Sequence, residues 1–226
     1  MSKEKPILFK AEMVRAILSG DKTMTRRVIK GVPRGDHFGK DIMDWALSSC
    51  YTDDEGRHHL KVQSDVDDNN HTELFCPQGK PGDLLWVRET WQRVYRYDDS
   101  YCIYGADYTE EEYINLQPWK PSIHQFRDDS RILLKITNVR VERLQDISEG
   151  DATREGIEKV GSFIPEWKDY GNDSLSFVFA VDSFRTLWDS INGKPRKDGV
   201  DISWRANPFV WVIEFEKLET VNNETR

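Results

Sequence analysis

Short apolar runs, separated by turns rich in glycine, proline and asparagine, limit what this chain can fold into. Short apolar runs predict strands at residues 6–9 and 84–87, and alternation of apolar and polar residues predicts one long strand or two short ones at 131–144 and a strand at 209–218. The β-branched stretch 23–29 is also typical of extended chain. Helical patterns occupy residues 10–19, 148–156 and 177–191. This mixture favours an α+β, mainly β fold, with a small curled sheet or barrel and helices packed outside it.

The chain of 226 residues shows no internal repeat and no clear linker, so we expect one domain. Residues 52–73 are polar and rich in Asp, Asn and His, which predicts an exposed insertion with little core of its own. The acidic, tyrosine-bearing stretch 95–113 indicates a hairpin that the pattern does not place. The expected architecture is therefore a single domain, 1–226, with insertions near 36–75 and 95–130.

Cysteine usage and hydropathy favour a cytoplasmic protein. The sequence has no apolar run of about 18 residues and no apolar leader, which argues against membrane insertion and secretion. Its three cysteines form no CxxC pair, so neither a disulfide framework nor a cysteine-rich zinc site is expected.

Nothing in the motif inventory predicts a metal or a cofactor. His58, His59 and His71 lie among aspartates without ligand spacing, and we interpret this segment as a solvated loop. The sequence also lacks a Walker loop, a GxGxxG fingerprint and a GxSxG elbow.

Charge is distributed unevenly along the chain. The net charge is -8, yet residues 1–40 hold 10 Lys and Arg against 4 Asp and Glu. An uneven solvated surface accounts for this equally well, but the asymmetry permits a basic patch on an acidic body, so a nucleic-acid partner is not excluded.

The densest chemical pattern runs through residues 20–27, where a glycine turn leads from a helix into a strand. In an extended segment, Thr25 and Arg27 face one way and Arg26 the other, while Lys22, at the turn, can point to either side. Lysine and arginine suit a phosphate, and a threonine hydroxyl can be activated by a neighbouring amine. A basic edge strand is the plain alternative.

Four blocks of sequence, at residues 6–27, 80–91, 136–157 and 207–218, together resemble the ASCH domain family, in the longer form encoded by bacteriophages and prophages. This resemblance implies a PUA-like β-barrel with flanking helices, a fold that often binds RNA.

Within that family, the chain is similar to the bacterial amidohydrolases that deacetylate N(4)-acetylcytidine. Their G-x-K-T-x-T-x-R run is matched by residues 20–27, and their glutamate-bearing helix by residues 151–156. The resemblance implies catalytic roles for Lys22, Thr25 and Glu155. Arg26 and Arg27 then suit phosphate binding or oxyanion stabilisation.

Further candidates for substrate binding are Trp86, Glu89 and Arg131. A tryptophan at a barrel mouth can stack a base, although a core position is the commoner role for such a residue. The basic, aromatic run 119–131 departs from the H-x-P-x-W-x-S-R pattern of related phage sequences, because the proline and the tryptophan are missing.

Three functions agree with these residues. The first is an amidohydrolase acting on an N(4)-acylated cytidine nucleoside or a similar modified base. The second is a non-catalytic module that binds RNA or a modified base, and the third is a ribonuclease. The acidic body disfavours long contacts with a duplex, so the expected partner is a modified nucleoside or single-stranded RNA, with no membrane involved.

Overall fold

The computed structural model describes residues 2–30, 50–54, 56–64, 67–96, 99–116, 118–161, 166–172, 175–194, 197 and 199–218. Within these residues, no helix is both long and apolar enough to cross a membrane.

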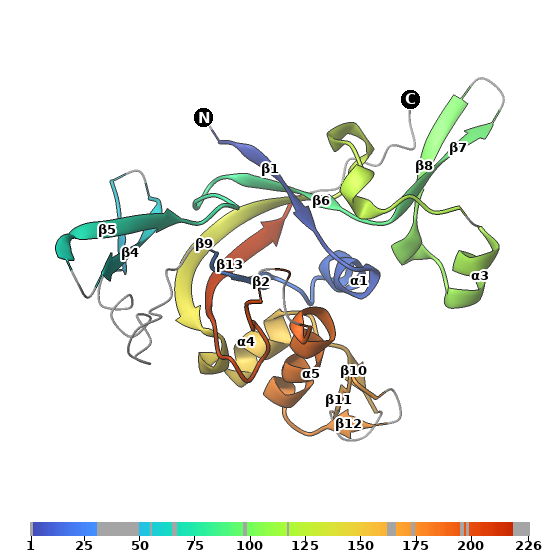
Figure 1. The fold of residues 1–226 in the computed structure, drawn as a ribbon. Coiled ribbons are helices and arrows are strands. Elements are labelled where there is room, and N and C mark those ends of the chain that lie inside the picture. Colours follow the sequence, from blue (N-terminus) through green and yellow to red (C-terminus); the bar gives the residue numbers. More distant parts are fainter. Residues whose placement is uncertain are drawn as a thin grey trace.

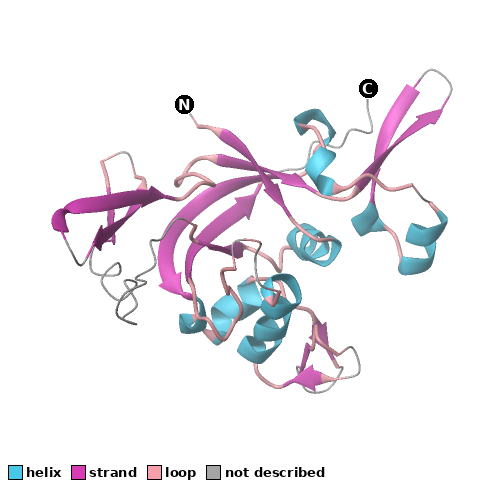
Figure 2. Cartoon of the chain, viewed as in Figure 1, coloured by secondary structure: helices cyan, strands magenta, loops and turns pink. Residues whose placement is uncertain are grey.

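A curved five-stranded sheet forms the centre of the molecule (Figure 1). Its strands are β1 (Glu4–Leu8), β6 (Leu84–Arg88), β9 (Leu133–Arg143), β13 (Phe209–Lys217) and β2 (Met24–Val28), in that spatial order. The β1–β6 pair is parallel and the other pairs are antiparallel. The predicted α+β, mainly β class is confirmed (Figure 2). The described residues form no closed barrel, because β1 and β2 remain the two edges of the sheet.

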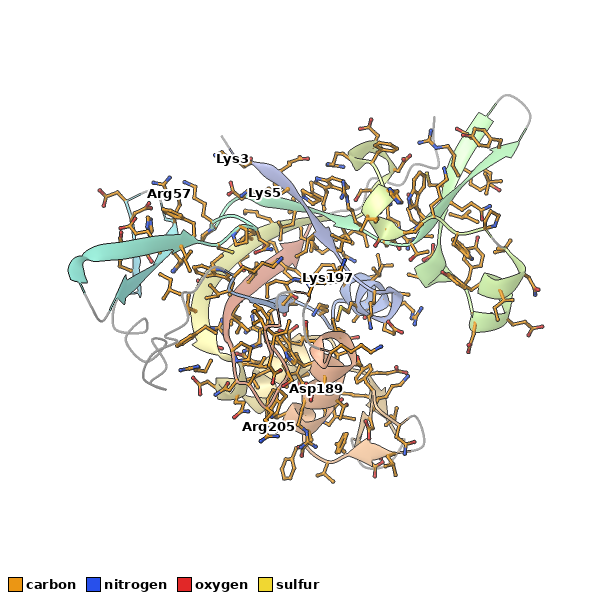
Figure 3. All side chains as sticks on the ribbon, in the orientation of Figure 1. Lys3, Lys5, Arg57, Asp189, Lys197 and Arg205 are labelled. Carbon is orange, nitrogen blue, oxygen red and sulfur yellow. The ribbon has the colours of Figure 1, made fainter. Side chains whose placement is uncertain are left out.

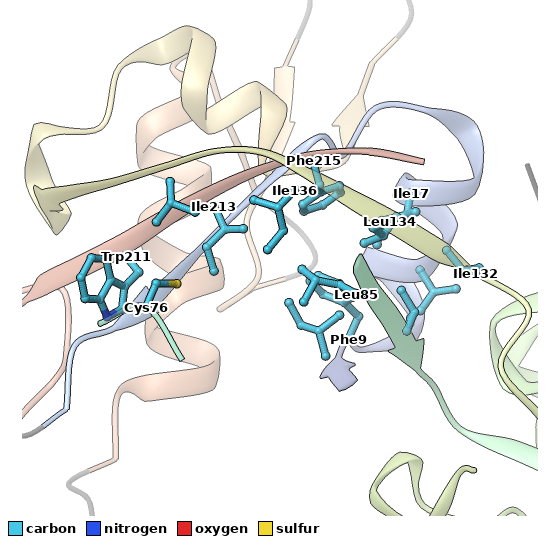
Figure 4. Close-up of a cluster of buried hydrophobic side chains, with 14 of the residues drawn as sticks. Phe9, Ile17, Cys76, Leu85, Ile132, Leu134, Ile136, Trp211, Ile213 and Phe215 are labelled. Atoms are coloured by element: carbon cyan, nitrogen blue, oxygen red, sulfur yellow. The ribbon is translucent and has the colours of Figure 1, made fainter. Parts of the chain in front are cut away.

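Both faces of this sheet are covered, which explains why residues 209–213 are all buried. On one face, Trp211, Ile213 and Phe215 join a cluster that includes residues of β6, β9 and helix α1 (Ala11–Ser19) (Figure 4). On the other face, Val210 and Val212 pack against α4 (Glu149–Arg154) and α5 (Ala180–Asn192). The helices predicted at 10–19, 148–156 and 177–191 are thus present, and the pattern at 131–144 forms one long strand.

Smaller elements extend from this centre. A three-stranded sheet joins β3 (Cys50–Thr52), β4 (His58–Ser64) and β5 (Asp67–Phe75), and Arg57 marks its position in Figure 3. A hairpin of β7 (Trp91–Arg96) and β8 (Asp99–Tyr104) precedes α3 (Glu110–Asn115). The strands β10 (Lys159–Val160), β11 (Glu166–Lys168) and β12 (Ser176–Phe177) form a third small sheet that contacts α5. In the part of the chain that the structure describes, single 3-10 turns occupy Gly105–Asp107, Ser122–His124, Arg127–Asp129 and Leu144–Asp146.

The expectation that the polar segment 52–73 is a solvated loop was wrong. This segment forms β4 and most of β5, and Leu60 is fully buried in the main core. His59 is 5% exposed rather than solvated, because it lies between Tyr51 and Phe75 and bonds the Asp53 carboxylate at 2.8 Å. The part of the predicted insertion at 36–49 lies outside the described residues.

Candidate functional site

The end of helix α1 places Lys22 in the interior. Gly20 ends the helix in the left-handed region at φ 90°, which glycine adopts without steric cost. The Lys22 backbone N–H then donates to the carbonyl of Ala16 at 2.9 Å, and the residue forms a single β-bridge with Glu155. The Lys22 side chain is fully buried.

Glu155 reaches the same place from helix α4. The Ser148 hydroxyl caps the start of this helix by accepting from the Asp151 N–H, and Glu155 is its C-terminal cap. The Lys22 Nζ donates to the Glu155 backbone oxygen at 2.6 Å and to Oε2 at 2.9 Å. The structure therefore brings together two residues that are 133 positions apart in the sequence and that the family resemblance pairs.

Burial changes the proton affinity of this amine. Desolvation lowers the pKa of Lys22 below its ordinary value of 10.5, because the charged form loses its water shell. The Glu155 carboxylate opposes this effect by favouring the ammonium form. The lowered pKa raises the fraction of neutral amine, which is the form that can accept a proton.

Arg26 is committed to carboxylates and offers no free cation. Its guanidinium is fully buried; Nη1 donates to Glu155 Oε1 at 3.2 Å, and Nη2 donates to Glu142 and Asp151 at 3.0 Å each. The prediction that Arg26 binds a substrate phosphate is therefore not supported by its position. Its contacts instead hold the Glu155 carboxylate in place.

Sequence reasoning missed the outer members of this ion-pair network. Arg140 contacts Glu142, Asp151 and Glu214 through its guanidinium, and Glu214 also accepts from Arg154 at 2.7 Å. Alternation along β9 carried the relevant signal: Val139 and Val141 face the core, so Asn138, Arg140 and Glu142 must share the opposite face.

Thr25 and Arg27 face away from Arg26, as the alternation predicts. Thr25 is buried opposite Ile213 of β13. The Arg27 Nη2 donates to the carbonyl of Leu8 at 2.8 Å and its guanidinium lies 5.2 Å from the Phe9 ring centre. Since the Lys22 Nζ lies 5.6 Å from the same ring, Phe9 connects the surroundings of Lys22 to the Thr25 face of β2.

The remaining candidates form two separate contacts. Trp86 is a buried residue of β6, and the Arg88 guanidinium lies over it, 4.6 Å from the centre of the Trp86 ring. Trp86 therefore has the position of a core residue. Glu89 and Arg131 form a two-point ion pair at 2.9 and 3.0 Å, and burial raises the pKa of Glu89 while Arg131 opposes the shift. In the described part of the chain, no hydrogen bond or ion pair joins Glu89 or Arg131 to Lys22 or Glu155.

A pocket of about 440 Å³ lies next to the buried pair of Lys22 and Glu155, which we call the Lys22 site. Its walls come from α1, α4 and the β10–β11 sheet and include Gly156, Trp167 and Tyr170. A methyl group on Gly156 would lie 2.6 Å from the Lys22 Cβ, so the glycine separates the pocket from the lysine stem. Lys22 itself does not line this pocket.

Other chemistry finds less support. Among the described residues, His, Cys, Asp and Glu form no group of three or more that could hold a metal ion.

Comparisons with protein-family models, with curated proteins and with solved structures find no match to this chain.

Proposed function

We propose that this protein is an amidohydrolase that removes the acyl group from an N(4)-acylated cytidine nucleoside or a similarly modified base. The observation that carries the proposal is the buried contact between the Lys22 Nζ and the Glu155 carboxylate at 2.9 Å, with Thr25 three residues further along. This contact joins the two sequence blocks in which the resemblance to the ASCH hydrolases places catalytic residues.

Each side chain has a role that amide hydrolysis requires. The neutral Lys22 amine takes a proton from the Thr25 hydroxyl, or from a water molecule that Thr25 positions. The activated oxygen forms a bond to the acyl carbon, the bond from this carbon to N(4) breaks, and the departing nitrogen receives the proton. When Thr25 is the nucleophile, water then hydrolyses the ester. Glu155 orients Lys22, and Arg26 holds Glu155.

Substrate access requires movement, because both Lys22 and Glu155 are enclosed. The pocket lined by Gly156 adjoins this pair, because Gly156 lies against the Lys22 stem, and Trp167 and Tyr170 in its wall are suited to contact a base ring. We infer that the acylated base approaches from this side and displaces part of the wall.

The finer fold assignment belongs to the same proposal. We infer that the curved sheet is a PUA-like barrel left open between β1 and β2. The bond from Arg27 to the Leu8 carbonyl supports this, because it links the ends of the two edge strands through a side chain.

The second candidate is a module that binds RNA or a modified base without turning it over. The complete burial of the Lys22–Glu155 pair favours this binding module, since a buried ion pair whose hydrogen bonds are all made can have a purely structural role. The third candidate, a ribonuclease, would need cations that can reach a phosphate. Arg26 is buried and so does not supply one.

Incubation with a panel of N(4)-acylated cytidines and single-stranded RNAs, read by mass spectrometry, separates these functions. We expect loss of the acyl group with the wild-type chain and little loss with Lys22→Met, Thr25→Val or Glu155→Gln. Combining the three should add little, because cooperating groups are not additive. Lys135→Met and Thr137→Val, at exposed positions of β9, are matched controls and should retain activity.

The pH dependence tests the role of the lysine. A lowered pKa means that the neutral amine forms as pH rises through a value below 10.5, so the rate should increase with pH in that range. Activity that survives Lys22→Met would remove this mechanism. A wild-type chain that binds RNA but leaves every acylated cytidine intact would favour the binding module.

A further inference from the structure

A second pocket, also of about 440 Å³, lies on a different part of the molecule, where β6 meets β7. Its lining residues are Arg88, Trp91, Lys120, Ile123, His124, Gln125 and Phe126. Its volume falls within the range of small-molecule sites, about 300–1,000 Å³. It contains none of the residues of the Lys22 site, so binding in this pocket does not depend on the proposed hydrolysis.

The described lining of this pocket carries basic side chains and no carboxylate to balance them. Arg88, Lys120 and His124 contribute basic groups, and none of the described lining residues is acidic. Within the described chain, no carboxylate lies within ion-pair distance of these three side chains, whereas most other arginines near the central sheet are paired. On a chain with net charge -8, two neighbouring cations without a carboxylate partner among the described residues, Arg88 and Lys120, favour an anionic ligand.

Two donors in the lining lack a partner. The Trp91 side chain is 2% exposed, and its indole Nε1–H finds no hydrogen-bond acceptor among the described residues. The same holds for the buried Nε–H of Arg88. Buried donors are rarely left unbonded, so these groups point to an acceptor-bearing ligand.

The loop that closes the pocket is held in place before any ligand binds. Lys120 exchanges two backbone hydrogen bonds with Trp91, at 2.8 and 3.2 Å, and its Nζ lies 4.9 Å from the Trp91 ring centre. At the other end, the buried Gln125 accepts from the Glu89 backbone N–H at 2.7 Å and donates to the Asp129 carbonyl at 2.8 Å. A site fixed in this way loses little conformational freedom on binding.

An exposed aromatic ring stands beside the cations. Phe126 is 69% exposed, although a phenylalanine usually lies in a core. Cationic donors next to an accessible ring match the phosphate and the base of one nucleotide. We propose that this pocket binds the phosphate of a nucleotide, with the base against Phe126.

Fluorescence anisotropy with a labelled ten-nucleotide single-stranded RNA tests the proposal on the full chain. Lys120→Gln should weaken binding roughly tenfold, the effect of one charge-assisted hydrogen bond. It should also reduce the slope of log affinity against log salt by about 0.7. Phe126→Ala should weaken RNA binding without loss of folding, because the ring is exposed. Arg185→Gln removes the same charge from an exposed position of α5 and should change nothing.

Competition identifies the source of the phosphate. Displacement of the RNA by cytidine monophosphate but not by cytidine supports a free nucleotide, and binding restricted to the oligonucleotide supports a strand. Either result requires sensitivity to Lys120→Gln. The proposal is overturned when Lys120→Gln and Phe126→Ala bind RNA as Arg185→Gln does, or when cytidine competes as well as its monophosphate.

Discussion

Replacing Glu155 by glutamine removes the charge to which two buried cations are bonded. Its carboxylate is 4% exposed and contacts the Lys22 Nζ at 2.9 Å and the Arg26 Nη1 at 3.2 Å. Breaking a buried ion pair by removing one partner costs about 3–5 kcal/mol. We expect the lower end, about 3 kcal/mol, for three reasons. Lys22 keeps the Glu155 carbonyl, Arg26 keeps Glu142 and Asp151, and the lowered pKa of Lys22 allows the amine to become neutral.

Urea unfolding, followed by tryptophan fluorescence at pH 7, measures this cost. With a slope of about 3 kcal/mol/M, the midpoint should fall by about 1 M. Glu142→Gln is the matched control, since Glu142 also bonds Arg26 but its side chain is 23% exposed. We expect about 1 kcal/mol or less for this variant.

A double-mutant cycle then tests whether Lys22 is the cause. Lys22→Met combined with Glu155→Gln should destabilise the chain by less than the sum of the single changes, by about 0.5–3 kcal/mol, because each single change leaves a buried partner behind. The reasoning fails when Glu155→Gln costs no more than Glu142→Gln, or when the two changes are additive.

Two further predictions concern backbone strain and thiol chemistry. Gly156→Ala should cost about 2–4 kcal/mol in urea unfolding, because φ is +78° and the new methyl group meets the Lys22 Cβ at 2.6 Å. Gly199→Ala, at φ +74° in open space, should cost about 1–2 kcal/mol, and equal costs would contradict the predicted contact. Burial, together with the Asp129 carboxylate, raises the pKa of Cys102 to about 11, so near neutrality it carries roughly a hundredfold less thiolate than a thiol of pKa 9.0. Its alkylation rate, measured by peptide mass spectrometry, should keep rising to about pH 11; a plateau near pH 9 would refute the shift.

Local patterns in the sequence determined most of the secondary structure. The apolar stripe of residues 10–19 with its glycine stop predicts α1, and Ser148 three residues before Asp151 predicts the start of α4. These signals are reliable because helix caps and periodicity act between neighbours in the chain. The polar segment 52–73 was misjudged because its strands are held by pairing with one another, and its apolar content is concentrated at Leu60.

For the candidate site too, some features followed from the sequence and others only from the tertiary structure. The pattern of residues 20–27 and the family resemblance marked Lys22, Thr25 and Glu155 from the sequence alone, but pairing Lys22 with Glu155 in space required the bridge between the end of α1 and the end of α4. Local pattern also suggested that Arg26 was available to a ligand, and it left Trp86 with two roles, base stacking or the commoner core position. Tertiary packing buried both side chains, because accessibility depends on which distant carboxylates and helices cover a side chain, and no local pattern contains that information.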